Sequence, residues 1–321
     1  MEIPKVSVII PVFNTEPFLK TAMFSILNQT LHEIELIIVD DGSTDNSLTI
    51  LKDLAQTDAR ISIFSQPNSG QSIARNTALK HATGEYVYFM DSDDILDVKA
   101  LEICYKEAKE KDLDIVTFDA VAFCENPSVK LRGYNYSRSG KIDEGVHSGI
   151  EMLELFLSDN LYKAAPWLLF VKRDFLVNLN LEFYPGIIHE DELFTPILYL
   201  NANRVLFIPK ILFHRRVREN STMTKGFSHK NLKGYYTVID ELQKWSSYKS
   251  KRITEIIDQL IFGFVNAVAY QSERFSFKER YAVFYYLLRN SLLHQVKYKN
   301  ITILIFPFTI TVKSFIRRVF S

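Results

Sequence analysis

The sequence predicts an α/β protein with a mostly parallel sheet covered by helices, followed by a C-terminal helical region. Two observations lead to this prediction. Up to about residue 115, short apolar runs rich in β-branched residues alternate with segments of helical periodicity, as is typical of a parallel sheet buried on both faces. After about Thr224, the chain turns to long segments with apolar residues three or four positions apart.

Four strands and three helices are expected before residue 91. The first helix is clearly marked, because Asn14 or Thr15 would cap it and Pro17 falls in its first turn. The expected strands are "VSVIIPVF" (6–13), "ELIIVDD" (35–41), "RISIFS" (60–65) and "TGEYVYFM" (83–90). The expected helices cover residues 16–30, 42–55 and 70–82.

The middle of the chain, from about 115 to 215, is less regular, and its polar tract at 125–149 is expected to cross the surface. Beyond it, residues 252–271 and 277–293 carry apolar side chains on one helical face. Such stripes are more typical of a core or a helix–helix contact than of a chemical site.

The net charge of zero conceals an asymmetry along the 321 residues. Residues 215–321 carry 19 Lys+Arg and 7 Asp+Glu, a net charge of +12, so residues 1–214 carry −12. The acidic part is suited to a cation, and the basic part to anionic lipid, phosphate or nucleic acid. No nucleic-acid motif is present, so a nucleic-acid partner is not expected.

The two cysteines, Cys104 and Cys124, give neither a disulfide framework nor metal-ligand spacing, and are expected to fill core space. The start of the chain has no signal-like pattern, and no run reaches the roughly 18 apolar residues of a membrane span. A cytoplasmic location is therefore expected, with peripheral contact at the inner face of the cell membrane as a further prospect.

The segment "YVYFMDSDDIL" sets Asp91, Asp93 and Asp94 at the end of a strand that reads as buried. In an open α/β sheet, ligands bind outside the carboxyl ends of the strands, where "VDD" at 39–41 also falls. Carboxylates this close repel one another and are costly to desolvate, so a positive group is expected among them.

Four interpretations of this cluster compete. An EF-hand loop would use Asp91, Asp93, Asp97 and Glu102, but it needs glycine where Leu96 stands. A dinucleotide site would need a glycine-rich fingerprint after the first strand, and the chain does not have one. A solvated helix start explains some of the charges but not the one beside the strand. A nucleotide diphosphate held through a divalent metal is the fourth, since hard cations prefer carboxylate oxygens and a bridging metal neutralises charge on a departing phosphate, although D-x-D alone is a weak signal.

Five segments, taken together and in order, resemble glycosyltransferase family 2, which has the GT-A fold: "VSVIIPVFN", "IIVDDGSTDNS", "NSGQSIARNTAL", "GEYVYFMDSDD" and "HEDELF". The resemblance covers roughly residues 6–223. It implies a catalytic domain at 1–224, with nucleotide-sugar binding in 1–115 and the acceptor side in 116–224, and a helical region at 225–321. It also implies a metal-dependent, inverting enzyme that uses Mn or Mg and serves bacterial polysaccharide assembly.

The resemblance assigns a donor site. Pro11, Phe13 and Glu16 would line the base and ribose pocket, and Asp41 would accept a hydrogen bond from uracil, which makes a UDP-sugar the expected donor. Arg75 would pair with Asp41 or Asp91 or contact phosphate, a purely structural salt bridge being the alternative. The remaining donor-site residues are Asn68, Gly70, Asp91 at the ribose, Ser92, Asp93 as metal ligand, and Arg216, Arg218 and Ser221 at the diphosphate.

On the acceptor side, Asp191 matches the family's catalytic base, and Glu190 is its rival or orients it. The alternative is that these two residues and Glu192 are only helix-start charges. Trp167 stands where relatives have an acceptor-side aromatic, although a core role is equally open. His189 is interpreted as a neighbour of the base, and His214 as a filler more than a metal ligand.

The tail at 298–321 combines apolar residues with Lys313, Arg317 and Arg318 and is too short to span a bilayer. It is expected either to lie on a membrane surface, near a lipid-linked saccharide acceptor, or to pack on protein, including a second copy in a homodimer. The alternative function is an inactive nucleotide-sugar-binding scaffold that acts through its helical tail. A degenerate relative would be expected to have lost Asp93 or Asp191.

Overall fold

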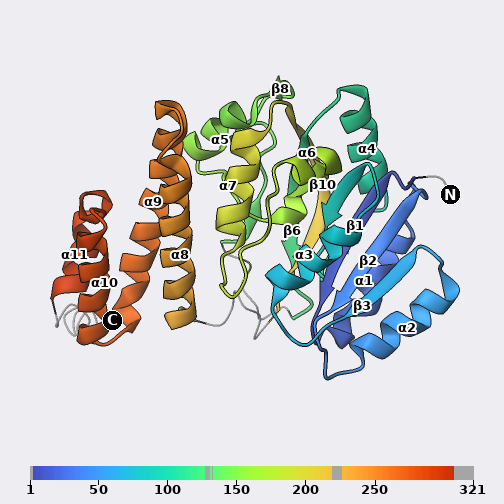
Figure 1. The fold of residues 1–321 in the computed structure, drawn as a ribbon, viewed down its shortest axis with the longest axis horizontal. Helices are drawn as coiled ribbons and strands as arrows, with labels where there is room; N and C mark the ends of the chain where they lie inside the picture. Colours follow the sequence, from blue (N-terminus) through green and yellow to red (C-terminus); the bar gives the residue numbers. More distant parts are fainter. Residues whose placement is uncertain (1–2, 127–130, 132, 219–225, 307–321) are drawn as a thin grey trace. The chain divides into compact units, whose positions relative to one another are not determined.

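The computed structural model describes residues 3–126, 131, 133–218 and 226–306 (Figure 1). The chain forms two compact units. The sheet-containing unit comprises residues 1–186 and 190–225, and the helical unit comprises 226–321 together with the short segment 187–189. The prediction that residue 221 contacts phosphate, and the predictions for the tail after 306, fall outside the described residues.

The first half of the sheet is parallel, with strands in the order β3-β2-β1-β4. The alternating sequence pattern thus predicted these strands and their helices correctly. The strands are β1 (Val6–Val12), β2 (Ile34–Asp40), β3 (Ile61–Ser65) and β4 (Tyr86–Phe89). The connecting helices are α1 (Glu16–Leu27), α2 (Ser47–Thr57) and α3 (Gln71–His81).

The second half of the sheet is mixed, because β9 lies antiparallel between β4 and β6. The order continues β9-β6-β10-β5, with β7 on β6 and β8 on β10. These strands are β5 (Ile95–Leu96), β6 (Ile115–Phe123), β7 (Asn135–Tyr136), β8 (Val146–His147), β9 (Leu169–Lys172) and β10 (Val205–Arg216). The helices are α4 (Ala100–Glu110), α5 (Gly149–Ser158), α6 (Arg173–Asn178) and α7 (Asp191–Asn201), with a 3-10 turn at Pro166–Leu168.

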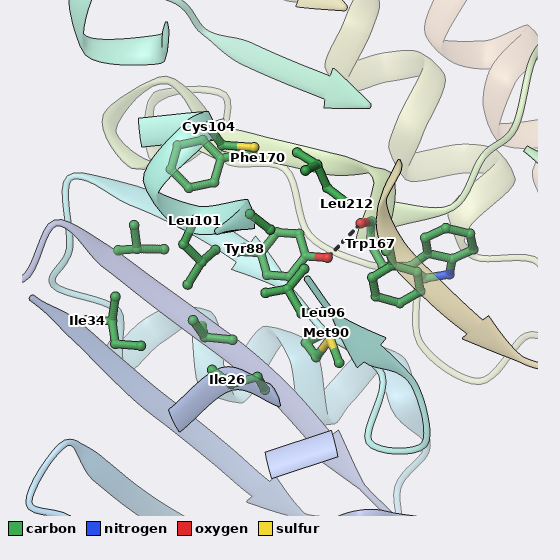
Figure 2. Packing of buried hydrophobic residues seen from close by; sticks show 14 of the residues in the cluster. Ile26, Ile34, Tyr88, Met90, Leu96, Leu101, Cys104, Trp167, Phe170 and Leu212 are labelled. Atoms are coloured by element: carbon green, nitrogen blue, oxygen red, sulfur yellow. Dashed lines mark hydrogen bonds between the residues drawn. The ribbon is translucent and has the colours of Figure 1, made fainter. Parts of the chain in front are cut away.

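The core of this unit joins the two halves of the sheet (Figure 2). The Tyr88 hydroxyl in β4 donates to the Trp167 carbonyl at 2.9 Å. The Trp167 ring stacks on Phe213 of β10 at 4.4 Å between centroids. Cys104 is fully buried, as expected of a core filler, whereas Cys124 is only partly buried. Leu96 belongs to β5, which pairs with β10, so this segment does not form an EF-hand loop.

The helical unit contains α8 (His229–Ser246), α9 (Lys251–Gln271), α10 (Phe277–Arg289) and α11 (Tyr298–Ile305), with 3-10 turns at Ser272–Arg274 and Leu293–Gln295. The apolar stripe of α9 is buried in the core of this unit and includes Ile257, Leu260 and Val268. Within the described residues, the segment Lys251–Arg274 is the one helix that could cross a membrane by length and composition. Its window is 44% buried inside the protein, so this evidence for a span is weak.

Candidate active site

The carboxyl end of β2 carries Asp41, which organises the loop before α3. Its Oδ1 accepts hydrogen bonds from Gln66 Nε2 and the Ser69 amide, and its Oδ2 accepts one from the Gly70 amide, all at 2.8 Å. Gly70 has a φ of +90°, a conformation that a side chain would strain. Both lone pairs of Oδ1 are thus engaged, whereas Oδ2 retains one that can accept a further donor such as a nucleobase N–H.

The other side chains expected around the nucleobase differ in their surroundings: some are exposed, and others are buried or hold neighbouring elements together. Phe13 is 46% exposed at the end of β1, whereas Pro11 is buried. Glu16 accepts hydrogen bonds from the amide and side chain of Asn46, at 3.0 and 2.8 Å, and thereby links α1 to the start of α2. Asn68 is exposed in the loop that Asp41 organises.

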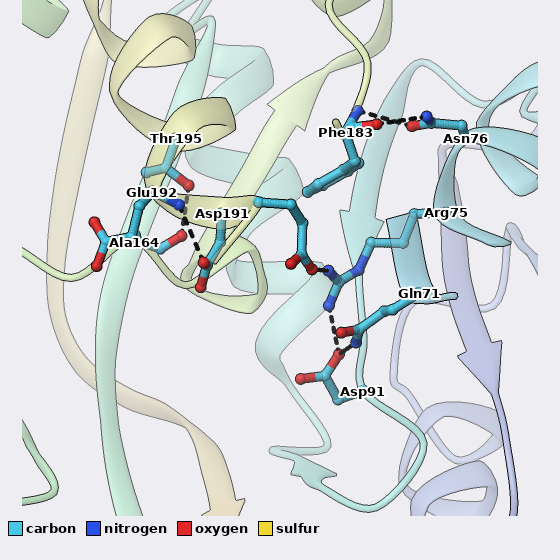
Figure 3. A network of polar contacts seen from close by, with 10 residues as sticks. Gln71, Arg75, Asn76, Asp91, Ala164, Phe183, Asp191, Glu192 and Thr195 are labelled. Atoms are coloured by element: carbon cyan, nitrogen blue, oxygen red, sulfur yellow. Dashed lines mark hydrogen bonds and ion pairs between the residues drawn. The ribbon is translucent and has the colours of Figure 1, made fainter. Parts of the chain in front are cut away.

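A buried guanidinium joins the end of β4 to the start of α7. Arg75 Nη2 pairs with Asp91 Oδ1 at 2.8 Å, and its Nη1 pairs with Glu190 Oε1 at 3.0 Å (Figure 3). Gln71 Nε2 adds a third contact, to the same Asp91 oxygen at 3.0 Å. The sequence offered Asp41 or Asp91 as the partner of Arg75; the structure has Asp91 and adds Glu190, which lies 115 residues from Arg75.

Asp93 faces a second guanidinium. Arg218 Nε donates to Asp93 Oδ2 at 2.6 Å, and Arg216 Nε donates to the Asp93 carbonyl at 2.7 Å. Burial, followed by the charge of Asp91, raises the pKa of the Asp93 carboxyl, and Arg218 opposes that rise. Asp94 accepts the Arg216 amide at 2.6 Å, and burial raises its pKa strongly. Ser92 between them is buried.

The donor set at Asp91 and Asp93 suits a divalent metal shared with a ligand. Within the parts of the chain that the structure describes, no group of three or more His, Cys, Asp or Glu side chains could hold a metal. A hard cation that keeps its waters is typically bound by one or two carboxylates plus substrate phosphates. Asp93 fits that pattern, since Arg218 contacts one of its two oxygens and its side chain is 18% exposed.

At the start of α7, the neighbouring carboxylates have different surroundings. Glu190 is bound by Arg75, whereas Asp191 Oδ1 accepts the backbone amide of Glu192 at 3.0 Å. Burial, with the charge of Glu190, raises the pKa of Asp191 to about 7. Burial, with the charge of Asp191, raises the pKa of Glu192 to about 8, while Lys163 and Tyr162 oppose that rise. A carboxyl with a pKa near neutrality is suited to accept a proton.

The structure adds residues that sequence reasoning did not select. Glu192 follows the predicted base, and its Oε2 is fully buried. Gln71 is the first residue of α3 and contacts Asp91. The charged run "HEDE" at 189–192 was the available signal for Glu192. Gln71 gave no local signal, because its role depends on the approach of α3 to the end of β4.

Trp167 is 5% exposed; its ring stacks on Phe213 and makes a T-shaped contact with Tyr136. This placement favours a packing role, and acceptor binding by Trp167 stays a prediction. His214 lies in β10 opposite Ile95 of β5, partly buried, and no metal-binding group of three or more includes it among the described residues.

Comparisons with known proteins identify the family and the fold of the chain. Residues 7–164 match the family model "Glycosyl transferase family 2". The chain is 32% identical over 249 residues to the uncharacterized glycosyltransferase YibD of Escherichia coli (strain K12), covering 74% of this chain and 70% of YibD. It spans only about a third of the length of two other curated relatives that it matches.

Two solved structures have the same fold. S. aureus TarS 1-349 in complex with UDP-GlcNAc aligns with a TM-score of 0.71 and 22% identity, over 94% of this chain and 84% of that one. The mannosyltransferase PcManGT from Pyrobaculum calidifontis, in complex with GDP-Man and Mn2+, aligns with a TM-score of 0.59 and 18% identity, over 91% and 76%. The GT-A fold expected from the sequence is therefore confirmed, and the chain belongs to glycosyltransferase family 2.

Proposed function

We propose that this glycosyltransferase is an inverting enzyme that transfers a sugar from a UDP-sugar to a saccharide or lipid-linked saccharide acceptor with the help of Mn or Mg. The observation that carries the proposal is the arrangement around Arg75. One guanidinium pairs with Asp91 on the donor side and with Glu190, the residue next to Asp191. Arg75 thus links a carboxylate of the proposed donor site to the residue next to the proposed catalytic base.

Asp191 is proposed as the base. It would take the proton of the acceptor hydroxyl as that oxygen attacks the anomeric carbon on the face opposite the diphosphate. Its pKa of about 7 lets it be ionised at neutral pH and still accept a proton. Glu190 already pairs with Arg75, so we assign it the role of orienting Asp191.

Asp41 and Asp91 are proposed to hold the base and the ribose of the nucleotide, and Arg216 and Arg218 to face the diphosphate. Asp93 would hold the metal, which when bound neutralises charge on the departing diphosphate. Arg218 contacts the same carboxylate, so its guanidinium is placed to add a bidentate phosphate contact once the donor is bound. The solved structures of TarS and PcManGT, which hold UDP-GlcNAc and GDP-Man, support a sugar-nucleotide donor.

We also propose that the helical unit contacts an anionic membrane surface. The exposed side chains Phe277, Tyr281, Tyr285 and Leu288 follow one another along one face of α10, with exposed Lys278 and Arg289 beside them. Together with the net charge of +12 in residues 215–321, this face suits the boundary between acyl chains and anionic head groups. Such a location would bring the enzyme to a lipid-linked acceptor.

The testing experiment measures nucleotide release from UDP-, GDP- and dTDP-sugars, with Mn and with EDTA. We expect wild-type release from one UDP-sugar that EDTA abolishes, and a loss of about 10²–10⁴-fold in kcat for Asp191→Asn. Asp93→Asn should lose metal-dependent donor binding, which calorimetry measures directly. Lys106→Ala, in an exposed pair with Glu110, is the matched control. Metal-dependent donor binding without turnover on any acceptor would favour the scaffold alternative, and no such binding would contradict the proposal.

A further inference from the structure

A phenylalanine of α1 lies against both guanidiniums of the candidate diphosphate site. The centroid of the Phe18 ring is 5.0 Å from the guanidinium carbon of Arg216 and 5.3 Å from that of Arg218. Both distances are within the roughly 6 Å over which the negative face of an aromatic ring attracts a cation. All three residues belong to the sheet-containing unit, where one ring is thus shared by two cations that come from the other end of its sequence.

The same two arginines also meet at Asp93. Arg216 Nε donates to the Asp93 carbonyl oxygen at 2.7 Å, and Arg218 Nε donates to its carboxylate Oδ2 at 2.6 Å. Two cations gathered at one residue repel each other, and a ring that contacts both offsets part of that repulsion. The pair of guanidiniums is therefore held by two groups, the aspartate and the ring of Phe18.

The two arginines differ in how enclosed they are. The side chain of Arg216 is 3% exposed, and its guanidinium carbon also lies 4.8 Å from the centroid of Phe123 and pairs with Glu125. The side chain of Arg218 is 32% exposed. Arg216 is thus the enclosed member of the pair, and Arg218 is the member that a ligand from solvent reaches more readily.

The backbone that carries the ring is fixed by the start of α2. The Phe18 amide donates to the Thr15 carbonyl at 2.9 Å and so closes the first turn of α1. The Thr15 amide donates to Ser47 Oγ at 3.1 Å. The Glu16 amide donates to Asp45 Oδ2 at 3.0 Å. Because the first turn is tied down in this way, the ring is presented by a rigid element, as a group that positions others requires.

We infer that Phe18 is a positioning residue for the diphosphate of the donor, because its ring holds the guanidiniums of Arg216 and Arg218 as a pair at Asp93. The inference rests on the proposed nucleotide-sugar site. Guanidiniums that are already placed lose less conformational entropy when a ligand binds, and their planar donors suit phosphate oxygens. The ring should therefore strengthen binding of the diphosphate and leave binding of the nucleoside part unchanged.

The test compares UDP with uridine, because uridine lacks the diphosphate. Phe18→Leu keeps apolar bulk but removes the aromatic face. We expect it to raise the Kd for UDP in the presence of Mn about tenfold, as the loss of two cation–π contacts predicts, and to leave the Kd for uridine within about twofold of wild type. Calorimetry measures the first and ligand-observed NMR the second. Phe18→Tyr keeps the ring and should bind UDP within about threefold of wild type. Phe24→Leu, at a 50% exposed position of the same helix, is the matched control and should bind both ligands as wild type does.

A second variant shows whether the ring acts through the arginines. In an Arg218→Ala background, Phe18→Leu should raise the Kd for UDP by a smaller factor, because one of the two cations that the ring contacts is already gone. An undiminished factor there would overturn the inference. An unchanged Kd for UDP in Phe18→Leu, or equal losses for UDP and uridine, would overturn it as well. A wild-type protein that binds no UDP would instead defeat the proposed function.

Discussion

Asp191 and Glu190 are adjacent carboxylates that the surrounding protein treats differently. The guanidinium of Arg75 reaches Glu190 at 3.0 Å, while Asp191 receives a backbone amide from Glu192. Two titratable groups whose environments differ in this way are typical of sites that divide orienting and proton-accepting roles. The burial of Asp191 also lowers stability, because an enclosed carboxylate without a cation partner makes folding less favourable when it is ionised.

Asp191→Asn should therefore stabilise the protein at alkaline pH. In the unfolded chain this carboxyl loses its proton near pH 3.8, and in the folded protein near pH 7, so its contribution to stability falls as pH rises between these values. At about pH 8 we expect the variant to gain roughly 1–4 kcal/mol in free energy of unfolding, and at about pH 4 to gain almost nothing. Denaturant unfolding at both pH values measures this, and an equal effect at both would contradict the assigned pKa.

Arg75 should be as important for stability as for the site. Arg75→Met leaves the buried carboxylate of Glu190 and the partly exposed carboxylate of Asp91 without their cation, and breaking a buried pair such as Arg75–Glu190 costs about 3–5 kcal/mol. Arg75→Lys keeps the charge but cannot span both partners, so we expect an intermediate loss. Urea unfolding compares them with Lys106→Ala, whose exposed pair contributes about 0–1 kcal/mol. A loss for Arg75→Met no larger than that of the control would argue against a buried bridge.

At the scale of the elements, β1 to β4 and their helices follow directly from the sequence, because each apolar run pairs with a neighbour close in the chain. The antiparallel β9 does not, since "LFVK" is four residues long and joins β4 to β6 over a large sequence separation. Tertiary packing also determines that Arg75 pairs with Glu190 and that residues 187–189 belong to the helical unit. Local patterns and family motifs indicated the residues of the candidate site but not how Arg75 and Glu190 pair within it.

Trp167 joins the 3-10 turn before β9 to β10, and its substitution should separate packing from acceptor binding. Trp167→Ala removes the stack on Phe213 and should lower the free energy of unfolding by about 3–5 kcal/mol, as truncation of a buried aromatic does. Trp167→Phe should recover part of the loss. Chemical denaturation together with the KM for the acceptor measures both effects. A raised KM with unchanged stability would restore the acceptor role expected from the sequence.

At the scale of the whole molecule, charge and function are distributed unevenly along the chain. The acidic residues of the candidate site lie at or before residue 192, whereas the net charge of +12 belongs to residues 215–321. An anionic surface attracts basic residues and repels carboxylates, so this distribution favours contact through the basic part of the chain. The proposed membrane contact follows from this charge together with the exposed side chains of α10.

Vesicle sedimentation tests that contact. We expect wild type to bind vesicles containing anionic lipid more strongly than neutral ones, and to be released by salt, because a juxtamembrane basic residue contributes about 1 kcal/mol that screening removes. The variant with Tyr281→Ser, Tyr285→Ser and Leu288→Ser loses exposed apolar area while keeping every charge, so its binding should weaken at all salt concentrations. Tyr248→Ser, which changes a 93% exposed tyrosine outside α10, is the control. Equal sedimentation of wild type and the triple variant would exclude α10 as the contact, and a change in oligomeric state of that variant would point to a second copy of this chain as the partner of that face.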